Sequence, residues 1–136
     1  MKVIFLDVDG VLNTNNTLYW DDSIEAHLVQ NLAAIVEATG AEIVLTSNWR
    51  FSHYSLRVLK DAFRYFNLTI YSEIEDQFCR ATEIKLWASK HKVDKYVVLD
   101  DEDENLSARF QEKFIKIDFS RGLTREVAEK AIKLLS

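Results

Sequence analysis

The sequence predicts an α/β fold, in which a parallel sheet of five strands lies between two layers of helices. Short apolar runs rich in branched and aromatic residues alternate with longer segments of helical periodicity along the whole chain. This alternation is typical of parallel sheets whose crossover helices cover both faces. With 136 residues, no proline and no linker-like segment, the chain is expected to form a single domain over residues 1–136.

Each expected strand is a short run of apolar residues that ends where polar residues begin. The first run is uninterrupted and is therefore expected to be buried on both faces. The five runs cover residues 3–6, 41–45, 68–71, 96–99 and 114–117.

The segments between these runs carry apolar residues at helical spacing. Residues 11–21 are expected to form a loop or small hairpin, residues 72–80 an irregular segment, residues 105–113 a short helix, and the residues after Gly122 the last helix. Helix starts are expected at Asp22 or Ser23, at Ser52 or Ser55, and at Thr82, and helix ends at Gly40 and Asn67.

Polar side chains follow three of the expected strands. These residues are Asp7 and Asp9 after the first strand, Thr46 and Ser47 after the second, and Asp100 and Asp101 after the fourth. An aspartate followed by Gly10 is also an ordinary turn signal, so the first pair alone could serve as turn and cap residues. However, the carboxyl ends of parallel strands meet at one edge of the sheet, where ligands bind. The convergence of all six residues therefore indicates a functional site.

Carboxylates and hydroxyls, with few histidines or thiols, form a hard-oxygen site that suits Mg²⁺ and not Zn²⁺. A hydroxyl at a strand end can hold a phosphoryl oxygen, and a basic residue must balance the charge of a transferred phosphoryl group. Arg80 is the candidate for this residue and Lys85 is the alternative, although either could be a solvated helix charge.

Four motifs resemble, in the right order and over nearly the whole chain, the signatures of the haloacid dehalogenase superfamily of phosphohydrolases. They are Asp-Val-Asp-Gly-Val-Leu at residues 7–12, Val-Leu-Thr-Ser at residues 44–47, the single base Arg80, and Val-Val-Leu-Asp-Asp at residues 97–101. The family often has threonine where this chain has Val11, a position outside the metal and proton roles. The Ser-Asn-Trp-Arg segment at residues 47–50 is similar to small phosphatase domains of nucleic-acid repair proteins.

The resemblance implies the strand order 5-4-1-2-3 and a mechanism. Asp7 would attack phosphorus and form an aspartyl-phosphate, while Asp9 would protonate the leaving group and then activate water. Mg²⁺ would contact Asp7, the backbone carbonyl of Asp9 and Asp101, with Asp100 ordering a metal-bound water. The choice between Asp100 and Asp101 stays open, and Thr46 is favoured over Ser47 as the phosphate ligand. Gly10 and Arg50 are assigned to the substrate side of the site.

Superfamily members usually insert a cap domain, but the intervals 13–41 and 51–79 are too short to hold one. An open site is therefore expected, which admits a phosphorylated nucleic-acid end or protein as well as a small phosphoester. Tyr19, Trp20 and Trp49 could stack on a base, although ordinary packing is the favoured interpretation of each. The oligomeric state is not predicted.

Composition restricts the classes of partner and compartment. A net charge of −5 disfavours broad adhesion to nucleic acid or to an anionic membrane. Cys79 is the only cysteine, no apolar run reaches membrane-spanning length, and the start of the chain lacks a signal-peptide pattern. A cytoplasmic protein is therefore expected.

Two other classes of function compete with the phosphohydrolase interpretation. A phosphoryl-accepting receiver domain uses a similar sheet and Mg²⁺, but it has adjacent acids after strand one and its acceptor after strand three. This chain has Asp7 and Asp9 separated by one residue, and no acid directly after Tyr71. A catalytically idle binding module on the same fold is disfavoured because both Asp7 and Asp9 are present.

Overall fold

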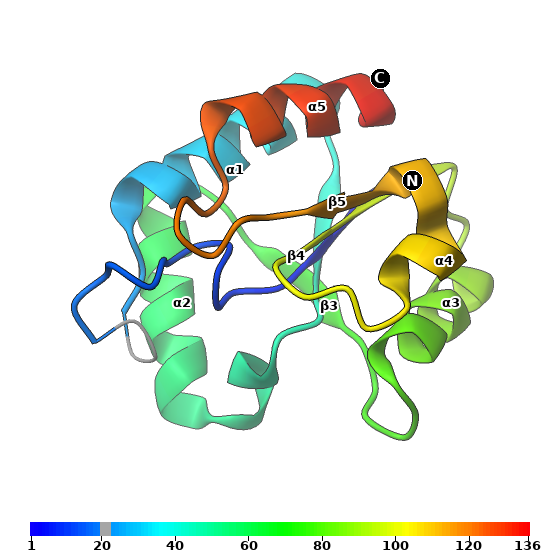
Figure 1. Cartoon of the computed structure of the whole chain (residues 1–136), viewed down its shortest axis with the longest axis horizontal. Helices are drawn as coiled ribbons and strands as arrows, with labels where there is room; N and C mark the ends of the chain where they lie inside the picture. The colour runs from blue at the N-terminus through cyan, green and yellow to red at the C-terminus, as the bar shows by residue number, and fades with distance from the viewer. Residues whose placement is uncertain (20–22) are drawn as a thin grey trace.

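The computed structural model describes residues 1–19 and 23–136 and has five parallel strands at its centre (Figure 1). The strands are β1 (Lys2–Leu6), β2 (Glu42–Leu45), β3 (Ile70–Glu73), β4 (Lys95–Asp100) and β5 (Phe114–Lys116). Their order across the sheet is β3-β2-β1-β4-β5, and each neighbouring pair is parallel. The predicted α/β class and strand order are confirmed.

Helices cover both faces of this sheet (Figure 1). One face carries α1 (Ala26–Thr39), α2 (His53–Tyr65) and α5 (Arg125–Leu135), whose buried side chains share one apolar cluster. The other face carries α3 (Arg80–Lys90) and α4 (Leu106–Phe110), which form a second cluster. In the part of the chain that the structure describes, the short 3-10 helices η2 (Asn48–Phe51) and η3 (Gln111–Lys113) follow β2 and α4.

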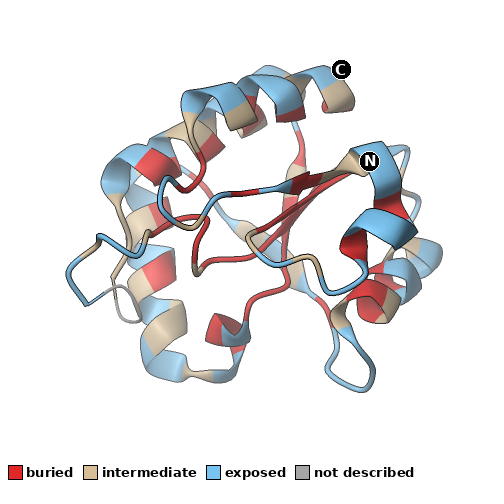
Figure 2. Ribbon diagram, viewed as in Figure 1, coloured by how far each residue is buried: buried red, intermediate tan, exposed pale blue. Residues whose placement is uncertain are grey.

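The apolar run of β1 supplies both clusters, because successive side chains of a strand point to opposite faces. Ile4 and Leu6 pack into the cluster with α1, α2 and α5, whereas Val3 and Phe5 pack against α3 and α4. All four side chains are fully buried, and the buried segments follow the strands through the centre of the molecule (Figure 2). An uninterrupted apolar run is therefore what this central strand requires.

The register of the sheet brings the predicted site residues together. Leu6 pairs with Leu45 on one side and with Leu99 on the other. Just beyond these pairs, the Asp7 amide donates to the Leu99 carbonyl at 3.0 Å, and the Thr46 amide donates to the Leu6 carbonyl at 2.9 Å. The polar residues that follow β1, β2 and β4 thus begin at one level of the sheet.

Several expected helix boundaries are confirmed. Ser52 caps α2 by accepting a hydrogen bond from the Ser55 amide, and Gly40 ends α1 with a left-handed φ of 72°. Asn67, the expected stop of the second helix, lies just past α2 and has a φ of 58°. The expectations for Trp20 and Asp22 fall outside the described residues.

Three boundaries differ from the expectation. Strand β3 begins at Ile70, not at residue 68, because the Leu68 amide still bonds the Phe63 carbonyl at the end of α2. Helix α1 begins at Ala26 after Glu25 and without a side-chain cap, so Ser23 is not its cap. Helix α3 begins at Arg80, which places Thr82 inside its first turn and not at its cap.

The described residues contain no separate cap domain, as expected. Between β1 and α1 they form loop structure, and between β2 and α3 they form only η2, α2, β3 and the connecting loops. Within the described residues, no helix combines the length and the apolar character needed to cross a bilayer.

Gly122 and Gly40 have nearly the same φ, 71° and 72°, but only Gly122 is crowded. A Cβ on Gly122 would lie 2.7 Å from Leu28 Cδ1 and 3.0 Å from the Val11 carbonyl oxygen, whereas one on Gly40 meets nothing within 4 Å. Gly40→Ala should lower the free energy of unfolding by the left-handed backbone cost of about 1–2 kcal/mol. Gly122→Ala should lower it more, because the backbone of the loop after β1 must also move. Urea denaturation of both variants tests this, and equal losses would contradict it.

Candidate active site

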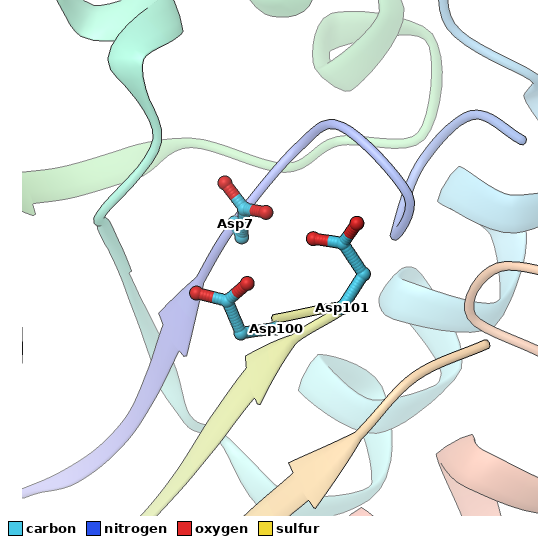
Figure 3. Close-up of side chains that lie close together, drawn as sticks. All are labelled: Asp7, Asp100 and Asp101. Carbon is cyan, nitrogen blue, oxygen red and sulfur yellow. The ribbon is translucent and has the colours of Figure 1, made fainter. Parts of the chain in front are cut away.

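Three carboxyl groups face one another at the carboxyl edge of the sheet (Figure 3). Asp7 follows β1, Asp100 ends β4 and Asp101 follows it. One oxygen from each lies within 4.8 Å of the others. Asp7 and Asp100 are almost completely buried, and Asp101 is partly exposed. The structure thus brings together three of the four residues predicted to hold a metal.

Arg80, the first residue of α3, reaches into this cluster. Its Nη1 lies 2.6 Å from Asp100 Oδ2 and 3.6 Å from Asp7 Oδ1. The alternative base, Lys85, instead places its Nζ 5.1 Å from the centre of the Phe110 ring. Of the two predicted candidates, Arg80 is the one that contacts the acidic cluster.

One guanidinium does not balance three carboxylates. Burial, and then the charge of Asp100, raise the pKa of Asp7 well above its usual value, and Arg80 only partly opposes them. Burial likewise raises the pKa of Asp101 to about 6. A divalent cation would relieve this repulsion, and a set of carboxylate oxygens is the ligand set that suits Mg²⁺. The residues present therefore fit the predicted metal.

Asp100 and Asp101 are held differently. Asp100 uses both of its oxygens, because Oδ2 accepts from Arg80 and Oδ1 accepts from the Glu102 amide at 3.0 Å. Asp101 lines the cavity described below, whereas Asp100 does not. This difference favours Asp101 as the direct metal ligand, in agreement with the assignment that the resemblance implied.

Gly10 makes room for Asp101. Its φ is +80°, and a Cβ at this position would lie 2.5 Å from Asp101 Cγ. Its amide donates to Asn13 Oδ1 at 2.8 Å. The glycine predicted on the substrate side therefore acts through the turn and the space that it leaves for a carboxylate.

Asp9 lies beside the cluster and not in it. Its Oδ1 accepts hydrogen bonds from Trp49 Nε1 at 2.9 Å and from Asn13 Nδ2 at 3.1 Å. Among the described residues, the acidic group that could hold a metal through side chains comprises Asp7, Asp100 and Asp101 without Asp9. The predicted metal contact of Asp9 was through its backbone carbonyl, and it stays a prediction.

Thr46 and Ser47 are both buried at the end of β2, but only Ser47 lines the cavity. Ser47 Oγ accepts a hydrogen bond from the Trp49 amide at 3.1 Å and so caps η2. Its own hydroxyl proton is not used by this bond. Ser47, and not Thr46, thus lines the cavity, and this arrangement does not support the preference for Thr46 as the phosphate ligand.

Arg50 binds backbone carbonyls of the loops and does not line the cavity beside Asp7. Its Nη1 donates to the carbonyls of Thr46 and Ser47, each at 2.8 Å, and its Nε donates to the Ile74 carbonyl at 3.2 Å. Only 8% of the residue is exposed, and a buried guanidinium needs such acceptors. These bonds tie the segment after β2 to the segment after β3. Arg50 also lines a second cavity that Arg80 lines, and its contact with substrate stays a prediction.

The cluster opens into a cavity of about 200 Å³. Its lining consists of Asp7, Asp9, Ser47, Asn48, Arg80, Asp101, Glu102 and Phe119. Sequence reasoning missed Asn48, Glu102 and Phe119. Phe119 had a usable signal, because it comes shortly after the fifth strand and hence belongs to the same edge of the sheet. A larger cavity of about 500 Å³ between α2 and β3 has no carboxylate in its lining.

An acidic cavity of about 250 Å³ adjoins the first and shares Asn48, Arg80 and Glu102 with it. Its carboxylates include Glu75, Asp76, Glu102 and Glu104. A hydrogen bond to the Glu104 side chain raises the pKa of Glu102. This side of the site is thus unfavourable for further phosphate groups.

Comparison with known proteins adds one finding to this geometry. The sequence model of a family described as the HAD domain in Swiss Army Knife RNA repair proteins matches residues 3–128. The chain belongs to this family. HAD abbreviates haloacid dehalogenase, so the resemblance inferred from the four motifs is confirmed at the level of the superfamily. Comparisons with curated proteins and with solved structures gave no match.

The metal-free HAD domain should lose stability as pH rises. The pKa of Asp101 is raised to about 6 in the folded chain, and that of Asp7 is also raised. Their contribution to stability is therefore present below their ordinary pKa values and is lost as pH rises through the folded values. With a chelator, the melting temperature should fall between pH 5 and pH 7, and Mg²⁺ should reduce the fall. Asp101→Asn should flatten it, while Asp61→Asn on α2 should not. A melting temperature that rises over this range would contradict the prediction.

Proposed function

We propose that the protein is a Mg²⁺-dependent phosphomonoesterase that acts through an aspartyl-phosphate on Asp7. Membership of the HAD family supports a phosphohydrolase in general. The observation that carries the finer proposal is the cluster of Asp7, Asp100 and Asp101 with Arg80 bound to it, at the edge of the sheet where ligands of such folds bind.

Asp7 is the proposed nucleophile because its carboxyl group lies beside Arg80 and lines the cavity. In the first step, an Asp7 oxygen would bond to phosphorus while the bond from phosphorus to the ester oxygen breaks. Arg80, 3.6 Å from Asp7 Oδ1, would offset the charge of the phosphoryl oxygens, and the Ser47 hydroxyl could donate to one of them. Mg²⁺ held by Asp7 and Asp101 would keep these carboxylates ionised and would neutralise phosphate charge.

Asp9 is the proposed proton carrier. Its carboxyl group lines the same cavity but does not belong to the cluster of Asp7, Asp100 and Asp101. It would give a proton to the leaving oxygen as the ester bond breaks. It would then take a proton from the water that attacks phosphorus and releases the Asp7 carboxylate. Each step returns the residue to the state that the other step needs, so one carboxyl group serves both.

The two rival functions fit the geometry less well. A receiver domain needs its phosphoryl acceptor at the end of the third strand, but Glu73, which ends β3, does not belong to the acidic group formed by Asp7, Asp100 and Asp101 among the described residues. An idle binding module would have no use for Asp7, Arg80 and Asp100 in mutual contact beside a cavity. Burying several charges together costs folding free energy, and such clusters are typical of catalytic sites, so this arrangement favours an enzyme over an idle module.

We further propose that the substrate is a phosphorylated RNA end. The family description names RNA repair proteins, and no cap covers the site in the described residues. Phe119 is half-buried in the cavity lining, where an aromatic side chain would come into contact with a terminal base. The acidic cavity with Glu102 and Glu104 lies on another side, so the strand would leave on the side of Phe119.

Asp7→Asn should abolish turnover, because an amide is a poor nucleophile. The wild-type protein, mixed with Mg²⁺ and an aryl phosphate and quenched in acid, should carry a phosphoryl group on Asp7. Mass spectrometry of the digested protein locates this group, and Asp61→Asn provides a matched control that should stay active. A phosphoryl group trapped on another residue would refute the assignment, as would turnover by Asp7→Asn.

Phe119→Ala should raise KM for a 3′- or 5′-phosphorylated RNA oligonucleotide by about 10-fold, because one base–aromatic stack contributes about 1–3 kcal/mol. KM for a small alkyl phosphate should stay unchanged. Phe78→Ala is the matched control, since this exposed ring lines only the acidic cavity. If Phe78→Ala has the larger effect on RNA, the strand follows the acidic side and the proposed path is wrong.

A further inference from the structure

We propose that Trp49 is a positioning residue for proton transfer, which holds the Asp9 carboxyl group through its indole N–H. This inference rests on the proposed phosphatase function and adds a residue to it. The contact joins two loops of the site, because Asp9 follows β1 and Trp49 lies in η2 after β2.

The hydrogen bonds to Asp9 are distributed unequally between its two oxygens. Trp49 Nε1 and Asn13 Nδ2 both donate to Oδ1, at 2.9 and 3.1 Å. Within the described part of the chain, no hydrogen bond reaches Oδ2, although Asp9 lines the cavity. A half-turn of the carboxyl group would only exchange the oxygens, whereas any smaller rotation would weaken both bonds. The two donors therefore fix the plane of the carboxyl group and leave one oxygen for the proton.

Trp49 cannot easily move away from this position. Only 5% of the residue is exposed, and its ring belongs to the apolar cluster under α1 and α2. Its amide is bound to Ser47 Oγ, and the adjacent Arg50 is bound to three backbone carbonyls. A buried ring of this kind does not stack on a substrate base, so the favoured interpretation of Trp49 as a packing residue agrees with the structure. What packing alone does not explain is the direction of the indole N–H.

Asn13 is fixed as firmly as Trp49. It is fully buried, its Oδ1 accepts from the Gly10 amide at 2.8 Å, and its Nδ2 also donates to the Ser23 carbonyl at 3.1 Å. The two donors to Asp9 thus come from rigid positions in different loops. An acid that must first give and then accept a proton at the same place gains from such fixed orientation.

Trp49→Phe removes the N–H and keeps an aromatic ring in the core, so it tests the hydrogen bond itself. The readout is the rate of the first step, transfer of the phosphoryl group to Asp7, measured in a single turnover. For an alkyl phosphate, whose leaving oxygen needs a proton, this rate should fall about 10- to 100-fold, the value of one hydrogen bond to a charged group. For an aryl phosphate it should change little, and the later attack of water, in which Asp9 also acts, is common to both substrates and lies outside this measurement. In an Asp9→Asn background, Trp49→Phe should cause no further loss for the alkyl phosphate.

Trp87→Phe is the matched control. Trp87 is 7% exposed, and its indole N–H donates to Ser72 Oγ at 3.2 Å, outside the residues that line the site. This variant should leave the ratio of the alkyl to the aryl phosphorylation rate at the wild-type value, even if its melting temperature falls. The amount of Asp7 phosphorylated by the aryl phosphate in one turnover reports how much of Trp49→Phe is folded.

An equal loss on both phosphates, no loss on either, or an undiminished loss in the Asp9→Asn background would overturn the positioning role. If Trp49→Phe does not fold, Asn13→Ser replaces it, since this change removes the second donor to the same oxygen. It should also lower the alkyl-to-aryl ratio, and an unchanged ratio would count against the inference. A wild-type protein that is inactive on both phosphates would instead refute the proposed phosphatase function.

Discussion

Excess negative charge at the carboxyl edge of the sheet is the constraint on which the rest of the site depends. Asp7, Asp100 and Asp101 place one oxygen each within 4.8 Å, and Arg80 is the cation in contact with two of them. Buried like charges of this kind persist only if something balances them. Here the described residues supply one positive charge in contact with the cluster, and the proposed Mg²⁺ would supply the remainder. The pKa values of Asp7 and Asp101 are raised first by burial and then by repulsion from Asp100.

The surrounding loops hold these charges in place at short range. Glu83 in α3 accepts from the amide of Phe78 at 2.8 Å, which orders the residues just before Arg80. Arg50 binds carbonyls on both sides of the gap between β2 and β3, and Gly10 leaves room for Asp101. Some residues next to the site thus shape it although they do not line the cavity beside Asp7. Arg50 is one of them, because its guanidinium binds backbone carbonyls.

The acidic lining beside the site affects which substrates can be accommodated. Glu102 and Glu104 share a cavity with Arg80, so a second phosphate group there would face carboxylates. For the proposed phosphatase, this charge pattern favours a single terminal phosphate over a polyphosphate. Glu102 lines both cavities, whereas Phe119 lines the one beside Asp7 and not the acidic one.

Apolar runs and their spacing determined the α/β class and the five strands, because each strand buried on both faces must be apolar throughout. The register of these strands follows from the same pattern, and it is enough to place Asp7 beside Asp100. Element boundaries that depend on local hydrogen bonds were harder to predict from the sequence. Strand β3 starts two residues later than its apolar run, because the Leu68 amide is still bound to the end of α2.

The sequence by itself determined which elements form and which polar residues follow the strands, because apolar runs and side-chain polarity can be read from it directly. The order of the strands was implied by the resemblance to a known family. Only the tertiary structure decided what the individual side chains bind. It turned Arg50 toward carbonyls, Arg80 toward Asp100, and the Trp49 indole toward Asp9. It also brought Phe119 into the cavity lining. Residue type and spacing do not encode these contacts. The pairs Arg50–Ile74, Arg80–Asp100 and Trp49–Asp9 are 24, 20 and 40 residues apart in the chain and meet only when the sheet has formed.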